Sequence, residues 1–312
     1  MGVVGVVGVV GVVGSAAVGG LVPAMTSLTW DRGVASAAEV PSLTRAPGSV
    51  VVHRFGGKNR VAKHWTARAM LAVATPRSAR AARTSMASGA TVGAARLTAR
   101  PSRGSKVVGA LFYSDGTGSH FCTASVIASA NHNLLVTAAH CMYSHGWKRN
   151  IAFVPGYRNG RAPYGIWPVV KATMYSAWTK YLDHNFDYTF LQVRPPKTQN
   201  LQVALGATDR LKIDARSGTW VVVTGYPLRL RRAIYCLNKA TAFSATQLEF
   251  RCAGFSSGTS GGPWDADYNW KKGTGNVIGV TGGYELGGIH SWISYSVRFG
   301  AAARSLYERA SR

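Results

Sequence analysis

The sequence predicts an all-β fold of closed barrels, and three observations support this expectation. Short β-type runs recur from about Val107 onward, separated by turns of Gly, Pro, Asn and Asp. No long segment shows helical periodicity before residues 301–312, which we expect to form a C-terminal helix. About 200 residues follow this starting point, which suits one domain built from many short strands.

The expected strands follow one another along this region and are rich in Val, Ile, Phe, Tyr and Thr. Such side chains pack well on a pleated, half-buried surface. The strands are expected within residues 107–116, 119–129, 133–141, 150–157, 165–174, 187–194, 218–227, 247–254, 276–285 and 290–300.

The N-terminal part of the chain has a different composition. Residues 1–29 carry no charged side chain and begin with a Gly-Val-Val repeat, which is apolar enough for transient membrane passage. This run resembles the core of a secretory signal, although no Lys or Arg precedes it and the small-residue site Ala35–Ala38 lies well downstream. We therefore interpret residues 1–37 as a signal-like segment, with a cleaved export signal favoured over a retained anchor.

Residues 38–105 are low in aromatics and interrupted by Gly, Pro and Arg. A segment of this composition buries too little apolar surface to offset the entropy lost on ordering. We expect a propeptide or a disordered or loosely ordered basic arm, with arginines that serve as processing sites. Order is expected to begin near Val107.

The chain is strongly basic, with 36 Lys and Arg against 12 Asp and Glu, or a net charge of +24. Up to Ser105 there are 13 basic and 2 acidic residues. This charge favours solubility and weak attraction to acidic surfaces. A nucleic-acid partner would need a recognisable module or aromatics interleaved with basic residues, and the sequence has neither. We expect no nucleic-acid partner.

The four cysteines all lie after residue 105. An even number beside an export-like start indicates disulfides, and four cysteines permit three pairings. The local pairing, Cys122–Cys141 and Cys236–Cys252, would close one short loop in each half of the region. No C-x-x-C is present, and the neighbouring His140 and Cys141 lack the usual ligand spacing, so we expect no metal.

Ser260 lies in the glycine-rich stretch "GFSSGTSGGPW". Flanking glycines permit a tight turn that can direct the backbone N–H groups of Gly258 and Ser260 at a developing oxyanion. Gly-x-Ser-x-Gly also occurs in α/β-hydrolases, but those need an acid and then a His after the serine. Here the plausible partners, His140 and Asp187, lie upstream.

The segments "TAAHC" (137–141), "DYTFL" (187–191) and "GTSGGP" (258–263) together resemble the three signatures of trypsin-like serine proteases. The similarity is greatest to the bacterial branch that includes glutamyl endopeptidases, which "HFCTASVI" and "VTGYP" also resemble. It extends from about Val107 to the C-terminus. The resemblance implies a protease domain at residues 106–312, made of two six-stranded antiparallel β-barrels with a cleft between them.

The resemblance also implies roles that fit the chemistry of each residue. Ser260 would be the nucleophile, His140 the general base and then acid, and Asp187 the group that orients the imidazole. Asp183 is the rival acid, but Asp187 directly precedes an apolar run and can be half buried. The two local disulfides would brace the loop of His140 and the second barrel.

Substrate specificity is where the sequence departs from the family. Val280 to Gly282 should pair with the substrate backbone, while Gly282, Gly283 and Tyr284 edge the first pocket. Thr281 stands where relatives that cleave after Glu have His, and Gly254 occupies the position of the trypsin pocket-floor acid. Thr259 precedes the nucleophile in place of the Asp used for ion-pair activation. We expect a preference for neutral or small-to-medium apolar side chains. We interpret His290 as a surface residue, with a group of the specificity pocket as the alternative.

The sequence therefore predicts a secreted, extracellular and monomeric serine endopeptidase that cleaves polypeptides without a cofactor. The alternative is a catalytically silent protein of the same fold that binds or adheres. An esterase or lipase is disfavoured by the order of the three site residues along the chain.

Overall fold

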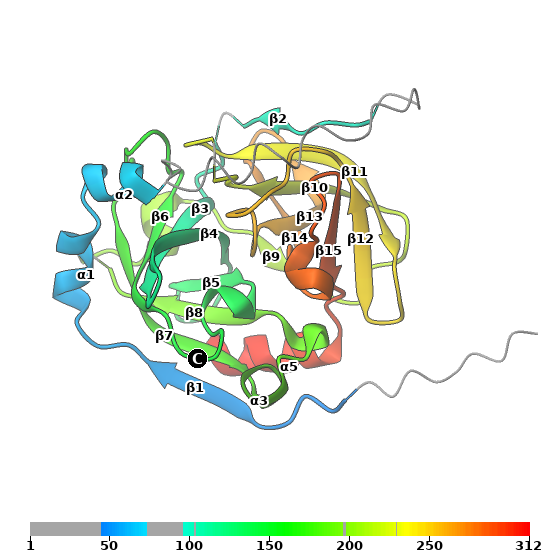
Figure 1. Ribbon diagram of the computed structural model, residues 1–312, viewed down its shortest axis with the longest axis horizontal. Helices are drawn as coiled ribbons and strands as arrows, with labels where there is room; N and C mark the ends of the chain where they lie inside the picture. The colour runs from blue at the N-terminus through cyan, green and yellow to red at the C-terminus, as the bar shows by residue number, and fades with distance from the viewer. Residues whose placement is uncertain (1–44, 74–95, 103, 196–197, 229) are drawn as a thin grey trace, which may run out of the picture. The chain divides into compact units, whose positions relative to one another are not determined.

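The computed structural model describes residues 45–73, 96–102, 104–195, 198–228 and 230–312 (Figure 1). The predicted signal-like segment and part of the predicted arginine-rich processing region lie outside these residues. Residues 42–312 form one compact unit, and the fold described below is that of this unit. Among the helices in the described ranges, none is both long enough and apolar enough to span a membrane.

The first barrel closes on itself through antiparallel pairing. Its strands follow the order β7-β6-β3-β4-β5-β8, and β8 pairs back with β7. Their side chains form a continuous core that includes Leu111, Phe153 and Phe190, each fully buried. The strands are β3 (Val108–Asp115), β4 (Gly118–Ile127), β5 (Leu134–Thr137), β6 (Arg149–Pro155), β7 (Trp167–Tyr175) and β8 (Thr189–Val193).

The second sheet follows the order β15-β12-β11-β10-β13-β14-β9. A bridge between Thr281 and Ser296, with a hydrogen bond from the Gly282 N–H to the Tyr295 carbonyl, brings the ends of β14 and β15 together. The predicted all-β class is confirmed. The strands are β9 (Arg210–Leu211), β10 (Thr219–Gly225), β11 (Ile234–Ala242), β12 (Gln247–Arg251), β13 (Pro263–Asn269), β14 (Thr274–Val280) and β15 (Ile293–Val297).

The expected C-terminal helix is also confirmed as α5 (Ala301–Ala310). It buries Ala303 and Leu306 against the first barrel, and the Tyr175 hydroxyl donates to the Ala302 carbonyl over 2.9 Å. The connections hold short helices only. These are α3 (Ser176–Tyr181), α4 (Leu201–Leu205), η2 (Ala139–Cys141), η3 (His184–Phe186) and η4 (Tyr284–Gly287).

Part of the segment that precedes Val107, where we expected order to begin, also contains regular structure. Strand β1 (Val50–Arg54) pairs with β7, and helices α1 (Lys58–His64) and α2 (Ala67–Val73) follow on the side of the first barrel (Figure 1). Strand β2 (Arg100–Pro101) pairs with β11. Few apolar residues suffice for this ordering because one of them, Trp65, is fully buried against the barrel.

Two disulfides cross-link the fold in the local pairing. Cys122–Cys141 joins β4 to η2, and Cys236–Cys252 joins β11 to the segment after β12. Each closes a short loop of the unfolded chain, which typically contributes about 2–4 kcal/mol. The first of these links holds the residue that follows His140.

Candidate active site

The pairing of β5 with β8 brings the first two predicted site residues together. Thr137, the last residue of β5, is paired with Thr189, the first residue of β8. His140 follows β5 in the short helix η2, and Asp187 lies between η3 and β8. Although 47 positions separate them in the sequence, the strand register places them side by side.

Asp187 is fully buried and accepts three hydrogen bonds. Its Oδ2 lies 2.7 Å from His140 Nδ1 and 2.9 Å from the Gly283 N–H, while Oδ1 accepts from the His140 backbone N–H over 2.9 Å. Burial alone would raise the pKa of this carboxyl, but the attraction of His140 and these hydrogen bonds lower it below its ordinary value. The ionised carboxylate orients the Nδ1–H tautomer of His140, which leaves Nε2 available as a base.

The rival acid Asp183 has a local structural role. Its side chain accepts a hydrogen bond from the Asn185 N–H over 3.0 Å and so caps η3. His184 contributes its backbone carbonyl to Gln247 Nε2 over 3.1 Å. The structure therefore brings Asp187, and not Asp183, to His140.

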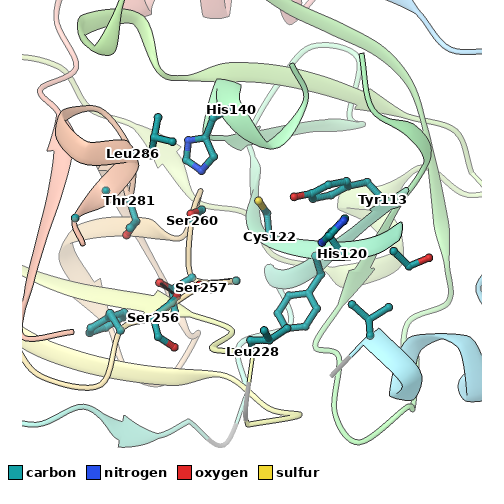
Figure 2. A pocket seen from close by; sticks show the side chains of 18 of the residues that line it. Tyr113, His120, Cys122, His140, Leu228, Ser256, Ser257, Ser260, Thr281 and Leu286 are labelled. Carbon is teal, nitrogen blue, oxygen red and sulfur yellow. Dashed lines mark hydrogen bonds between the residues drawn. The ribbon is translucent and has the colours of Figure 1, made fainter. Parts of the chain in front are cut away.

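Ser260 and His140 line one pocket of about 1050 Å³. Figure 2 shows the His140 ring directed toward Ser260, which the loop between β12 and β13 carries. The Ser260 carbonyl accepts from the Thr123 N–H over 2.7 Å, so the serine is tied to β4 of the first barrel. The third predicted site residue thus lies in the same pocket as the histidine.

The loop before Ser260 exposes two backbone donors to this pocket. Among the interactions of the described residues, neither the Gly258 N–H nor the Ser260 N–H donates to a protein acceptor. Gly258 has a φ of 95°, and an added Cβ would lie 2.6 Å from the Phe121 ring and from the Tyr226 carbonyl. A side chain at this position would clash with both neighbours, so the conformation of the loop requires glycine.

Thr123 fixes the conformation of this loop from the first barrel. Its Oγ1 donates to the Gly258 carbonyl and accepts from the Tyr226 N–H, each over 2.9 Å. Its carbonyl accepts from Thr137 Oγ1 over 2.8 Å, which links the loop to the strand that precedes His140. Thr123 and Tyr226 lie in HFCTASVI and VTGYP, two segments that contribute to the family resemblance, but the local sequence does not show that these two residues meet.

Of the six predicted substrate-binding residues, the structure places Thr281 in the lining of the pocket, where Figure 2 shows its side chain. The Thr281 Oγ1 accepts from the Trp264 indole N–H over 3.1 Å. The remaining five, Gly254, Val280, Gly282, Gly283 and Tyr284, lie outside that lining.

The structure gives a physical reason for the positions of these residues. An added Cβ at Gly254 would lie 3.4 Å from Ala99, so a side chain here would point at the N-terminal segment. Val280 is fully buried, and Tyr284 packs against the rings of Phe243 and Tyr295. Gly283 instead contacts the acid, through its N–H to Asp187.

Other residues complete the lining of the pocket. His290, interpreted from the sequence as a surface residue with a pocket group as the alternative, is exposed and lines the pocket, and it stacks on Trp292 with a ring separation of 4.4 Å. Ile293 and Ser294 of β15, the strand that the Thr281–Ser296 bridge joins to Thr281, also line the pocket. On the opposite side the lining comes from α2 and from β3 and β4.

One group of potential metal ligands occurs among the described residues, made of Cys122, His140 and Cys141 with ligand atoms within 4.8 Å of one another. Both sulfur atoms belong to the Cys122–Cys141 disulfide. A disulfide sulfur is not a thiolate, so this group does not offer the donors that a Cys/His metal site requires.

Comparisons with known proteins show what this chain is similar to. A segment of 78 residues is 35% identical to an extracellular metalloprotease of Bacillus subtilis, and it spans 24% of this chain and 24% of that protein. Similar solved structures include a protease, Anisep, from Arthrobacter nicotinovorans (24% identity, TM-score 0.62), which matches 69% of this chain and 99% of its own.

Two further structures have the same fold. A thermostable serine protease, AL20, from an extremophilic microorganism is 24% identical with a TM-score of 0.61, over 66% of this chain and 97% of its own. A Glu endopeptidase is 16% identical with a TM-score of 0.55, over 69% of this chain and 97% of its own. The model of the trypsin family matches residues 97–301. The chain therefore belongs to the trypsin family of chymotrypsin-fold serine proteases.

Proposed function

We propose that this protein is a secreted serine endopeptidase that hydrolyses peptide bonds through an acyl-enzyme. The observation that carries the proposal is the shared pocket of Ser260 and His140, in which Asp187 holds the imidazole from behind. A serine hydroxyl is inert without a neighbouring base, and this arrangement supplies one. The sequence order His, Asp, Ser is that of the family.

In the proposed first step, the Ser260 Oγ attacks the carbonyl carbon of the scissile bond and His140 Nε2 takes the hydroxyl proton. The N–H groups of Gly258 and Ser260 stabilise the oxyanion of the tetrahedral intermediate. His140 then gives its proton to the leaving amine, the C–N bond breaks, and the acyl group remains on Ser260. In the second half of the reaction His140 takes a proton from a water molecule, whose oxygen attacks the acyl carbon. The ester bond to Ser260 then breaks, the acid leaves, and His140 returns the proton to the Ser260 Oγ.

The side chain before the scissile bond is proposed to enter the part of the pocket next to Thr281. Ile293, Ser294 and Phe255 line this part. Because Thr281 Oγ1 is bound to the Trp264 indole, and Ser294 is neutral, these walls suit a neutral or small-to-medium apolar side chain. The lining of the pocket also includes Glu285, which is half-buried, and His290, which is exposed, so a charged substrate side chain would meet a solvent-accessible partner there and not a buried one.

Secretion belongs to the same proposal. Both cysteine pairs form disulfides, which persist mainly in oxidising compartments. The relative in Bacillus subtilis is described as extracellular. Intact-mass measurement of the protein recovered from culture medium tests this, and protein retained in the cytosol with reduced cysteines would contradict it.

A fluorophosphonate probe tests the catalytic proposal, since it labels a serine only when that serine is activated. We expect labelling and peptide hydrolysis by the wild type and by Ser257→Ala, a change at an exposed serine of the same loop. Ser260→Ala should lose both while it keeps the unfolding transition of the wild type. Absence of labelling in the mature wild type would favour the alternative of a silent binding protein.

A further inference from the structure

The segment that precedes the recognised protease motifs is built into the first barrel. β1 pairs with β7 over five residues, from Val50–Tyr175 to Arg54–Lys171. The Phe55 N–H donates to the Val170 carbonyl and the Ser176 N–H to the Ser49 carbonyl, over 2.9 Å and 2.8 Å. β6 pairs only with residues 167 and 168 of β7. β1 pairs with the part of β7 that β6 leaves unpaired.

The two helices that follow β1 are held by one large aromatic anchor. Trp65 lies between α1 and α2, is fully buried, and packs on Phe112 of β3 with a ring separation of 5.1 Å. Its indole N–H donates to the Asn150 carbonyl of β6. Val61 and Met70 are buried in the same core. Burying side chains of this size contributes several kcal/mol, which fixes both helices on the barrel.

Helix α2 ends at the cleft that contains the candidate site. Ala69 and Val73 line the pocket of Ser260, as does His64 at the end of α1. They lie with Tyr113 and His120 of β3 and β4 on the side opposite Thr281. Figure 2 shows this division, with Thr281 on one side of Ser260 and His120 and Tyr113 on the other.

The two sides of the pocket would bind different parts of the substrate. The acyl part of the substrate lies toward Thr281, and His140 delivers its proton to the amine that leaves on the other side. We propose that α2, together with β3 and β4, forms the binding surface for the leaving-group side of the polypeptide substrate. Residues 45–73 are then part of the working enzyme and are not a removable propeptide. This inference rests on the proposed endopeptidase function.

The composition of this side indicates which leaving groups it takes. Phe121 and Leu228 add apolar surface to that of Ala69 and Val73. Among the described residues that line this side, none is an acid. The nearby Asp115 is paired with Lys148 over 2.9 Å and with His120 over 3.1 Å, so it is already neutralised. Apolar side chains should therefore be preferred to basic ones after the scissile bond.

Ala72 offers a direct test because it is exposed, lies on α2 and lines the pocket. The full chain carrying Ala72→Glu would be compared with wild type on two quenched peptides of identical acyl side, with Leu or Lys after the scissile bond. Ala67→Glu is the matched control, since Ala67 is an exposed residue of the same helix outside the pocket lining. A coumarin amide with the same acyl part would serve as a second substrate. Its leaving group is a dye and not a peptide, so release of the dye measures acylation of Ser260 without peptide binding on the leaving-group side.

Wild type is expected to prefer Leu to Lys in kcat/KM. In Ala72→Glu the Lys-to-Leu ratio should rise about tenfold, as expected for one new charge at a partly desolvated contact. Ala67→Glu should keep the wild-type ratio, and N-terminal sequencing of the active enzyme should find residues 45–73. An unchanged ratio in Ala72→Glu, or an active enzyme without these residues, would overturn the inference. Wild type that leaves the coumarin amide uncleaved would instead overturn the proposed function.

Discussion

Replacing Thr123 by Val tests how the first barrel shapes the oxyanion site. The side chain is fully buried, and Val preserves its volume while removing the hydroxyl. The Gly258 carbonyl and the Tyr226 N–H then each lose a partner at 2.9 Å. An unsatisfied buried polar group costs about 1–3 kcal/mol, so the loss of both partners should lower the free energy of unfolding by about 2–6 kcal/mol.

The same change should reduce turnover, because Gly258 carries one of the two N–H groups proposed to bind the oxyanion. Loss of one such donor costs roughly 10²–10³ in kcat, and a misdirected donor should cost less, about 10–100-fold. Turnover and unfolding would be measured on the same preparations. Turnover of a peptide amide would be measured at saturating substrate, under conditions where the variant is folded. Unfolding would be followed in a urea titration.

Thr189→Val provides a matched control. Thr189 is also fully buried in the first barrel, and its hydroxyl donates to the Thr173 carbonyl over 2.9 Å, away from the Ser260 loop. It should lower stability by about 1–3 kcal/mol and leave kcat close to wild type. If Thr123→Val kept wild-type kcat, or if both variants lost kcat equally, the proposed coupling between Thr123 and the oxyanion site would be wrong.

Three further predictions concern other parts of the molecule. Asp187→Asn would place an amide NH₂ against one of the three donors that now bind the carboxylate. The kcat in steady-state assays should therefore fall about 10⁴-fold. A kcat close to that of the wild type would contradict the proposed role of Asp187. Trp65→Ala should cost about 3–5 kcal/mol in urea unfolding, whereas the exposed Trp220→Ala should cost under about 1 kcal/mol; equal losses would contradict the anchoring role of Trp65. Burial and the neighbouring carboxylate of Asp209 raise the pKa of Asp265 well above its ordinary value. Above a pH of about 4 the Asp265 carboxyl is therefore ionised in the unfolded chain but still protonated in the folded protein. The free energy of unfolding should fall as the pH rises through this range. Asp265→Asn should flatten that decline in melting temperature against pH, and the exposed Asp267→Asn should leave it steep.

The sequence predicts most of the strands of this fold, because β-branched and aromatic residues concentrate in short runs between turns. Besides the short or N-terminal strands β1, β2 and β9, two long strands, β11 and β13, are absent from the predicted segments. Burial alternates irregularly along β11, and β13 carries Asp265 at a fully buried position, so neither has the composition of a core strand. Their place in the sheet is decided by pairing with β10, which a local pattern does not reveal.

The regular structure within residues 45–73 was not predicted from the sequence for a related reason. A low average content of apolar residues predicts disorder only when those residues lack a matching surface. Here Trp65 and Met70 insert into a core that the barrel supplies, and β1 adds to an edge that already exists. Composition indicates how much apolar surface a segment can bury within itself. Residues 45–73 are ordered because their apolar side chains pack on the first barrel.

Residues of each half of the domain hydrogen-bond to site residues of the other half. The three sequence motifs do not include all of these hydrogen-bonding partners, so the motifs alone do not describe the whole site. Asp187 follows η3 in the first barrel, yet one of its three hydrogen bonds comes from Gly283, beyond β14 of the second sheet. Ser260 lies on a loop of the second sheet, yet its carbonyl and that of Gly258 are bound by Thr123 of the first barrel. A change that let the two halves slide would move the acid and the oxyanion donors together. Activity should therefore be lost under milder denaturing conditions than those that unfold either barrel, because the site depends on contacts between the barrels that neither core maintains by itself.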